Sequence, residues 1–524
     1  MRVIDFFDKG ADIDPGRAFL RCGLHAVTYE EARRHSKQVA EALHRHGMGV
    51  GVRVGVLAPN VPEAFLAMLG LWRAGCSWVP LNTRNAISAT VAYMNRVDCR
   101  ALFVHVSFAA ELEQLRKQVP SLELIVGLND DEFDGAMAMP QFLSEANWPA
   151  TSEVDSFEWN DPFGRPDVEA CAWPTGGTTG GSKAVVWTNR IWSALIETAT
   201  RHWPAVERPV NMLVAPITHA AGVMAIVYAS LGATIVMRPG FDADDVLDQI
   251  ESERVTHLFL PPTAFYGLLE SQRAHPRDCS SLTMLLLSAA PVAPDRLALG
   301  VEVFGPCIAQ CWGQSEAPFV LTYLGTDVLA AAASGHHPER VRSCGRATFA
   351  SQVAVMDDGG KLLAPGGVGE LVARGELVTP GYVNDPAATA AIRLHGWHHT
   401  GDIGYLDESG FVYIVDRKGD MIITGGFNVY PTEVEAVLHE IPHVHQSAVF
   451  GVPHEKWGEA VVAAIVPTPG SELLADDVLK QARQLLGPVK TPKSIVFVES
   501  LPQTAVGKVD KRALRSCLGE APQV

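Results

Sequence analysis

A stretch rich in glycine and threonine, residues 175–183, carries the residue types that bind a phosphate group. It reads Thr-Gly-Gly-Thr-Thr-Gly-Gly-Ser-Lys and follows residues 170–173, which we predict to form a strand. Glycines let the backbone turn sharply and bring N–H groups close to an anion. Threonine hydroxyls add donors, and the lysine adds a positive charge. The pattern therefore predicts a phosphate-binding loop.

This loop does not fit the P-loop motif of nucleoside triphosphatases. That motif requires a lysine directly after its second glycine and then a serine or threonine. Here Gly176 and Gly181 have the required separation, but Ser182 follows Gly181 and Ala184 follows Lys183. The P-loop interpretation fails by one residue.

Other short blocks along the chain carry side chains that could bind a nucleotide or do chemistry. They are residues 216–219 (PITH), 288–291 (SAAP), 312–316 (WGQSE), 396–402 (GWHHTGD), 416–420 (DRKGD), 424–428 (TGGFN) and 502–511 (PQTAVGKVDK). In order and spacing, these blocks and the loop resemble the adenylate-forming superfamily. That superfamily contains acyl-CoA synthetases, adenylation domains of nonribosomal peptide synthetases and beetle luciferases. The resemblance covers nearly the whole chain and favours the acyl-CoA synthetase branch.

The loop departs from the usual family sequence, Ser-Gly-Thr-Thr-Gly-x-Pro-Lys-Gly, at three positions. Gly176 replaces the serine, Ser182 the proline and Ala184 the last glycine. One hydroxyl contact to phosphate is lost, and we expect looser handling of pyrophosphate.

The resemblance implies a role for each matching residue. Catalysis is assigned to Lys508, His219, Thr178 and Lys183, with Lys508 between the acyl carboxylate and the α-phosphate and His219 beside the carboxylate. Nucleotide binding is assigned to Thr175, Gly176, Gly177, Thr179, Gly180, Ala289, Ala290, Pro291, Gln310, Cys311, Trp312, Gly313, Ser315, Asp402 and Arg417. Within this set Trp312 flanks the adenine, Ser315 binds the α-phosphate, and Asp402 binds the ribose hydroxyls.

Further assignments concern the metal, the hinge, the thiol substrate and the acid. Glu316 and Thr178 are expected to hold Mg²⁺, for which carboxylate and hydroxyl oxygens are suitable ligands. Gly419 is the expected hinge, and Gly425 and Gly426 line the coenzyme A channel. The acyl pocket is expected to include Ala220, Ala221 and Met224, with Ala289, Gln310 and Cys311 as further candidates.

The implied function is ATP-dependent ligation of a carboxylic acid to coenzyme A through an acyl-adenylate, with release of AMP and pyrophosphate. Small apolar pocket residues favour a medium-chain aliphatic, alicyclic or aromatic acid over an amino acid. Three alternatives stay open: an enzyme that loads a carrier protein, a luciferase-like oxygenase, and a catalytically silent nucleotide-binding protein. Lys508, Glu316 and Asp402 are all present, which argues against the silent protein.

The elements that must position these blocks alternate between strands and helices. Thr28 and Glu31 have the spacing of a capping box, so a helix is expected to follow Thr28. Residues 53–57 and 77–81 are predicted strands, separated by a helix that begins at Pro62. The same alternation returns over residues 211–237 and 255–288, which predicts parallel α/β sheets.

The sequence pattern changes after residue 341. Residues 341–416 consist of short β-rich runs punctuated by turn dipeptides, which predicts a β subdomain. A helix is expected from Pro431, followed by strands near residues 447–452 and 460–467. The expected fold class is therefore α/β: a large N-terminal domain (1–418) of two α/β lobes plus a β subdomain, and a small mobile α+β C-terminal domain (419–524) that carries Lys508.

Composition excludes several other classes of protein. Of the 524 residues 47% are hydrophobic and 19% are charged, and the net charge of −17 disfavours nucleic acid as a partner. No apolar stretch is long enough for membrane insertion, and the acidic N-terminus does not resemble a signal peptide. Nine scattered cysteines without a CxxC pair fit a reducing, cytoplasmic location. The adjacent His398 and His399 lack a third ligand at suitable spacing and are expected to be structural, and a homodimer is left open.

Overall fold

The computed structural model describes residues 1–128, 133–144, 165–175, 182–503 and 509–518. These residues form two compact units. The first contains the described residues among 1–175, 182–353 and 373–398, and the second contains those among 354–372 and 399–518.

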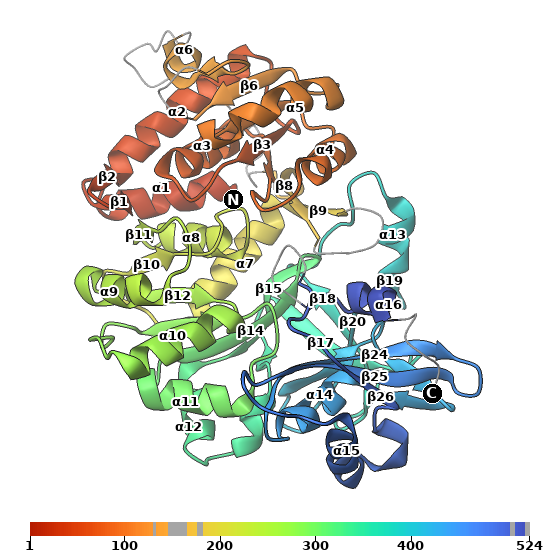
Figure 1. Ribbon diagram of the computed structural model, residues 1–524. Helices are drawn as coiled ribbons and strands as arrows, with labels where there is room; N and C mark the ends of the chain where they lie inside the picture. Colours follow the sequence, from red (N-terminus) through yellow and green to blue (C-terminus); the bar gives the residue numbers. More distant parts are fainter. Residues whose placement is uncertain (129–132, 145–164, 176–181, 504–508, 519–524) are drawn as a thin grey trace. The chain divides into compact units, whose positions relative to one another are not determined.

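The first unit contains a seven-stranded sheet that is mostly parallel (Figure 1). Its order is β7 (Met137–Ala138), β6 (Leu124–Gly127), β5 (Ala101–Val104), β3 (Arg53–Leu57), β4 (Ser77–Pro80), β8 (Glu169–Pro174) and β9 (Ala184–Thr188). β9 is antiparallel to β8, so the two strands flank the glycine-rich loop. The predicted strand over residues 53–57 is confirmed at both ends.

A second, nine-stranded sheet completes the core of the first unit. Its order is β16 (Arg346–Ala347), β15 (Ala317–Leu324), β14 (Ile308–Gln314), β13 (Met284–Leu287), β12 (His257–Leu260), β10 (Val210–Leu213), β11 (Thr234–Met237), β1 (Ala18–Cys22) and β2 (His25–Thr28). Within this sheet, neighbouring strands between β14 and β1 pair in parallel, and β2 pairs antiparallel to β1. The two sheets are the two α/β lobes that the sequence predicts.

Helices connect and cover these strands. They are α1 (Val3–Ile13), α2 (Tyr29–Arg45), α3 (Pro62–Arg73), α4 (Ile87–Arg96), η1 (Val106–Glu111), α5 (Leu112–Gln118), α6 (Met139–Ser144), α7 (Asn189–His202), α8 (Ala220–Ala229), α9 (Ala243–Glu253), α10 (Pro262–Ala274), α11 (Pro294–Phe304), α12 (Thr326–Ala333), η3 (Pro338–Arg342) and α13 (Pro386–Ala391). Helices α9 to α12 lie side by side in chain order (Figure 1).

Local sequence explains where several helices begin. The Thr28 side chain accepts a hydrogen bond from the Glu31 backbone, and the Glu31 carboxylate accepts one from the Thr28 backbone. This reciprocal pair satisfies N–H groups that the first turn of α2 leaves unpaired, as the capping-box spacing predicts. α8 differs because residues 221–229 are all buried, which is typical of a helix that is apolar on every side.

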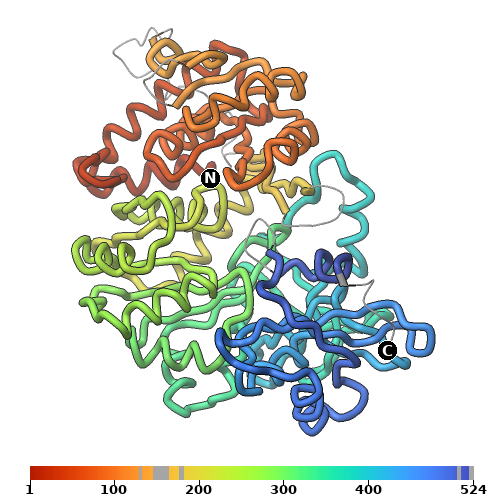
Figure 2. The backbone as a smooth tube through the Cα atoms, viewed as in Figure 1, coloured from red at the N-terminus to blue at the C-terminus, as the bar shows by residue number. Residues whose placement is uncertain are grey.

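The N-terminal segment packs against a distant part of the first unit. Figure 2 shows the red N-terminal segment beside the yellow-green one near residue 230, and α1 contacts α8. The Tyr29 hydroxyl donates to the carbonyl oxygens of Ala229 (3.1 Å) and Ala233 (2.7 Å). The sequence did not predict α1, β1 or β2.

The β-rich region predicted after residue 341 is a five-stranded sheet. Its order is β17 (Ser351–Met356), β18 (Gly369–Gly375), β20 (Trp397–Leu406) and β19 (Arg393–Leu394), and β21 (Val412–Arg417) pairs with β20.

The second unit contains a further five-stranded sheet. Its strands are β23 (Phe427–Val429), β22 (Ile422–Thr424), β25 (Gly458–Pro467) and β24 (Val444–His454), with β26 (Ser494–Phe497) paired to β25. Its helices are α14 (Pro431–His439), α15 (Ala475–Lys490) and α16 (Lys511–Leu518). The predicted helix from Pro431 and the two predicted strands are confirmed. Across the described ranges of both units, none of the helices combines the length and apolarity that crossing a bilayer requires.

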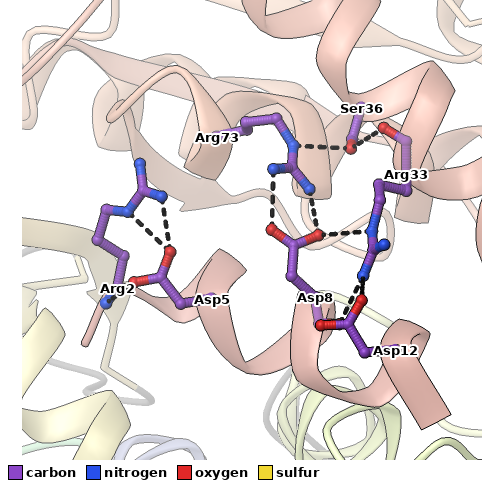
Figure 3. A network of polar contacts seen from close by, with 7 residues as sticks. All are labelled: Arg2, Asp5, Asp8, Asp12, Arg33, Ser36 and Arg73. Carbon is purple, nitrogen blue, oxygen red and sulfur yellow. Dashed lines mark hydrogen bonds and ion pairs between the residues drawn. The ribbon is translucent and has the colours of Figure 1, made fainter. Parts of the chain in front are cut away.

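A network of ion pairs fastens α1 to α2 and α3 (Figure 3). The Asp8 carboxylate accepts two hydrogen bonds from the Arg73 guanidinium (2.7 and 2.9 Å) and one from Arg33 (3.2 Å). Arg33 also pairs with Asp12 (2.6 Å), whose side chain is 70% exposed, whereas that of Arg73 is only 8% exposed. Asp8 is therefore the partner that compensates a nearly buried charge.

We predict that Asp8→Ala lowers the free energy of unfolding of the chain by about 1–3 kcal/mol, because the Arg73 charge stays buried without its partner. The matched variant Asp12→Ala removes an exposed pair and should cost no more than about 0.5 kcal/mol. Urea unfolding of both variants measures the difference. Equal midpoints for the two variants would contradict this account of the network.

Candidate active site

The two ends of the glycine-rich loop are fastened to each other. The Thr175 backbone N–H donates to the Lys183 carbonyl oxygen (2.9 Å), and the Lys183 N–H donates to Thr175 Oγ1 (3.2 Å). Ser182 Oγ donates to the Thr175 carbonyl oxygen (2.7 Å). The serine that replaces the family's proline therefore adds a hydrogen bond at the base of the loop.

Parallel strands bring several predicted blocks to one edge of the nine-stranded sheet. β10, β12, β13 and β14 are successive parallel neighbours, so their carboxyl ends share an edge. His219 follows β10, residues 289–291 follow β13 and are exposed, and Glu316 follows β14. Ligands of α/β sheets bind at such edges. Of the predicted site, the residues 219, 289–291 and 310–316 are thus brought together.

Tyr382 contacts two of the predicted site residues, Glu316 and Lys183. Its hydroxyl donates to Glu316 Oε1 (2.6 Å), and the Lys183 ammonium lies 4.9 Å from the centre of its ring. Burial, followed by the charge of Glu316, raises the pKa of Tyr382 well above its usual value, so the phenol stays protonated and remains a donor. The contacts hold a carboxylate and an ammonium on opposite parts of one side chain.

The turn between β14 and β15 requires close backbone approach. A Cβ at Gly313 would lie 2.5 Å from the backbone nitrogen of Phe319, so glycine is needed there. Ser288 Oγ donates to the Cys311 carbonyl oxygen (2.8 Å), which ties the end of β13 to β14. Ala289 has φ of 77°, a conformation that costs a residue with a Cβ energy and is found at functional sites.

Trp312 and Cys311 lie in β14 with buried side chains. Burial raises the pKa of the Cys311 thiol to about 12, so it stays neutral. Gln310 occupies the same strand, and its side chain is partly buried. The adenine contact expected of Trp312 stays a prediction.

His219 precedes α8 and has a largely buried ring. Burial, assisted by the positive charge of Arg84, lowers its pKa to about 4, so the imidazole is neutral near pH 7. Within the described part of the chain, Nε2 of His219 is buried without a hydrogen-bond partner. An unpaired imidazole nitrogen of this kind suits a hydrogen bond to a polar ligand group or to water. Ala220, Ala221 and Met224 follow on α8.

In the second unit, Asp402 and Arg417 face each other across β20 and β21. Arg417 Nε lies 2.7 Å from Asp402 Oδ1, and the Asp402 side chain is 4% exposed against 52% for Arg417. The ribose role of either residue stays a prediction.

The buried carboxylate of Glu370 accepts hydrogen bonds from residues next to Asp402 and Arg417. It accepts hydrogen bonds from the Gly401 backbone (3.0 Å), His399 Nδ1 (3.0 Å) and Lys418 Nζ (3.1 Å). Burial opposes its ionisation, but these hydrogen bonds outweigh burial and lower the pKa of Glu370. His399 thus has a structural partner. No group of three potential metal ligands from His, Cys, Asp and Glu occurs in the part of the chain that the structure describes.

The predicted hinge and the predicted coenzyme A turn have different backbones. Nothing lies within 4 Å of a Cβ built on Gly419, so no neighbour demands glycine there. Gly425 and Gly426 form the two-residue turn of the β22–β23 hairpin with φ of 58° and 82°, which favours glycine at both positions. Phe427, beside this turn, is exposed.

Six predicted residues lie outside the described ranges: Gly176, Gly177, Thr178, Thr179, Gly180 and Lys508. Their roles therefore stay predictions from the resemblance.

Residues 7–383 match the family described as AMP-binding enzyme, and residues 433–508 match the AMP-binding enzyme C-terminal domain. The chain belongs to the AMP-binding enzyme family. This AMP-binding enzyme lies in the acyl-CoA synthetase branch of the adenylate-forming superfamily, as its sequence motifs predict. Its mixed α/β fold, with a large N-terminal and a small C-terminal part, is also the predicted one.

Individual relatives are similar over most of their length. The AMP-binding enzyme is 36% identical over 503 residues to the medium/long-chain-fatty-acid–CoA ligase FadD8 of Mycobacterium tuberculosis, covering 91% of this chain and 83% of FadD8. It is 31% identical to the indoleacetate–CoA ligase of Aromatoleum aromaticum, covering 98% of each. The solved structure of the amide bond synthetase McbA from Marinactinospora thermotolerans is 30% identical, with a TM-score of 0.87 and coverage of 98% and 99%.

Motif matching missed Tyr382, which contacts the predicted site residues Lys183 and Glu316, and Glu370, which contacts the chain neighbours of Asp402 and Arg417. Tyr382 follows Gly381 in a region that reads as turns and short strands, and Glu370 begins an ordinary strand pattern. Their roles depend on hydrogen bonds to residues 66 positions and 29 positions away, which a local pattern does not reveal.

We predict that His219→Gln makes stability less sensitive to acid. The folded chain holds His219 with a pKa of about 4, whereas the unfolded chain has the ordinary value near 6.5. Between these values the unfolded chain takes up a proton that the folded chain excludes, so stability is lost as the pH falls through this window. Thermal unfolding at pH 7 and pH 4.5 should show a smaller drop for the variant than for the wild type. The exposed His25→Gln control should match the wild type, and an unchanged drop in His219→Gln would contradict the prediction.

We predict that Tyr382→Phe lowers kcat/KM for ATP about 10- to 100-fold, the range for a hydrogen bond to a charged group. The phenylalanine ring still faces Lys183, so only the contact to Glu316 is lost. Tyr382→Leu removes both contacts and should cost more. Pyrophosphate release from each variant measures the effect, and wild-type activity in the phenylalanine variant would refute the assigned role of the hydroxyl.

Proposed function

We propose that this AMP-binding enzyme is an ATP-dependent carboxylic acid–CoA ligase. In the first half-reaction a carboxylate oxygen attacks the α-phosphorus of ATP, the bond to the β-phosphate breaks, and acyl-adenylate and pyrophosphate form. In the second, the coenzyme A sulfur attacks the acyl carbon, the thiol proton is lost, and acyl-CoA and AMP leave.

The observation that carries this proposal is the line of contacts from Lys183 through Tyr382 to Glu316. The first half-reaction brings together two anions, a carboxylate and a triphosphate. An ammonium and hydrogen-bond donors fixed before the reaction reduce that repulsion without having to reorganise. Within this proposal Lys183 faces the phosphates, Ser315 contacts the α-phosphate, and Lys508 bridges it and the acid.

The residues present fit a magnesium ion bound together with the nucleotide. Mg²⁺ in such sites takes one or two carboxylates and completes its shell with phosphates and water. Glu316 would supply one carboxylate, whose Oε1 accepts a hydrogen bond from Tyr382. When bound there, the ion would neutralise charge on the phosphates.

The acid is proposed to lie against α8, with its carboxylate near the neutral imidazole of His219. Ala220, Ala221 and Met224 are small or apolar, which supports a medium-chain aliphatic, alicyclic or aromatic acid. The names of the relatives are in keeping with this range, since one acts on medium- and long-chain fatty acids and another on indoleacetate.

For the second half-reaction we propose coenzyme A as the acceptor. The Gly425–Gly426 turn leaves its backbone open to a pantetheine chain. We also propose a domain boundary between residues 1–418 and 419–524. The smaller domain would turn about Gly419 between the two half-reactions. A cytoplasmic location belongs to the same proposal.

A second candidate differs only in the acceptor. The 30% identity to the amide bond synthetase McbA favours an amine as the alternative nucleophile. A carrier-protein thiol is a third acceptor that uses the same first half-reaction.

The test uses the purified full chain with ATP, Mg²⁺, coenzyme A and a panel of short, medium, aromatic and alicyclic acids, with products identified by mass spectrometry. We expect acyl-CoA, AMP and pyrophosphate in equal amounts for at least one acid. Lys508→Ala should lose adenylate formation by about 100-fold or more yet keep thioester formation from supplied acyl-adenylate. Formation of acyl-adenylate without thioester would indicate that the acceptor is an amine or a carrier-protein thiol and not coenzyme A. Absence of turnover with every acid would refute the ligase proposal.

A further inference from the structure

Trp187 connects the strand after the glycine-rich loop to the turn that carries Ser315 and Glu316. It lies in β9, its side chain is 1% exposed, and its indole Nε1 donates to the Ser315 carbonyl oxygen at 2.7 Å. The ring is stacked on that of Trp173 in β8, with centres 4.3 Å apart and planes inclined by 4°. A ring held in this way presents its N–H in one direction.

Thr379 makes a second connection at the next residue of the same turn. Its backbone N–H donates to the Glu316 carbonyl oxygen (2.8 Å), and its Oγ1 donates to the Val186 carbonyl oxygen in β9 (2.7 Å). Two successive peptide carbonyls are therefore held from β9, one by Trp187 directly and one through Thr379. These two peptide planes lie on either side of Glu316, so fixing both of them fixes the direction in which the Glu316 side chain leaves the backbone.

We propose that Trp187 is a positioning residue for adenylate formation: its indole N–H holds the Ser315–Glu316 turn at a fixed distance from the strand that follows the glycine-rich loop. β9 and the turn then keep one spacing. This inference rests on the proposed function for its kinetic readout. Trp187 itself does not touch the reacting atoms.

The chain offers a matched control in Trp192 of α7. Its ring contacts that of Trp187 edge-on, with centres 5.5 Å apart, and it is fully buried. Among the described residues its Nε1 has no hydrogen-bond partner. Trp187→Phe and Trp192→Phe therefore remove the same atoms from adjacent sites, but only the first removes a hydrogen bond to the turn.

The experiment compares both variants by pyrophosphate release and by hydrogen–deuterium exchange of peptides that cover residues 313–318. For Trp187→Phe we expect kcat to fall about 3- to 10-fold, the range for one neutral hydrogen bond. KM for the acid should stay unchanged, and exchange in residues 313–318 should be faster. Trp192→Phe should stay within about 2-fold of the wild type, since it loses no hydrogen bond.

Further variants separate positioning from packing. In a Glu316→Gln background, the loss caused by Trp187→Phe should shrink, because residues that act through one another are not additive. Thr379→Val, which removes the hydroxyl contacts to Val186 and Gly381, should reproduce the faster exchange and supplies the same test if Trp187→Phe fails to fold.

Two results would overturn the inference: equal loss of kcat and equal exchange in the two tryptophan variants, or a raised KM for the acid with unchanged kcat. If no acid is turned over, the proposed ligase function fails. The exchange comparison, together with calorimetric binding of ATP to each variant, still decides the role of Trp187.

Discussion

The peptide carbonyls of Ser315 and Glu316 are held by Trp187 and Thr379. The geometry of the groups that we propose to bind the nucleotide in the first unit depends on that attachment. Lys183, Glu316 and Tyr382 come from three separate segments of the chain. Groups that stabilise charge during phosphoryl chemistry are effective only when they are fixed before the reaction. The hydrogen bonds between these segments supply that fixation.

The sheets explain how such distant residues meet. Parallel neighbours from β10 to β14 place His219, Ala289 and Glu316 at one edge, although they lie far apart in sequence. The β8–β9 hairpin of the other sheet carries the ends of the glycine-rich loop, closed by the hydrogen bonds between Thr175 and Lys183. Each sheet supplies one part of the site, and the indole of Trp187 joins the two.

Local patterns predicted much of this architecture. The capping box at Thr28 and the apolar run of residues 53–57 depend on neighbours within a few positions, so a sequence alone reveals them. The motif blocks identified the family and named His219 and Glu316 through type and spacing. The pairing of β1 with β11 was not predictable in this way, because it joins segments more than two hundred residues apart.

The residues that hold the site were the least visible in the sequence. Trp187 reads as one more buried residue of a strand, and nothing in its neighbourhood indicates that its N–H reaches Ser315. Tyr382 likewise stands out only through its contacts with Glu316 and Lys183, which lie elsewhere in the chain. The same is true of Asp8, which becomes important because α3 brings the nearly buried Arg73 beside it.

The central claim is that the acid is activated through an acyl-adenylate. An acid labelled with ¹⁸O in its carboxylate, turned over with ATP and coenzyme A and followed by mass spectrometry of the nucleotide, tests it most directly. The account predicts that AMP carries one ¹⁸O, because the carboxylate oxygen that attacks the α-phosphorus stays with AMP when the thiol displaces it. Unlabelled AMP, or label in inorganic phosphate with formation of ADP, would contradict the account.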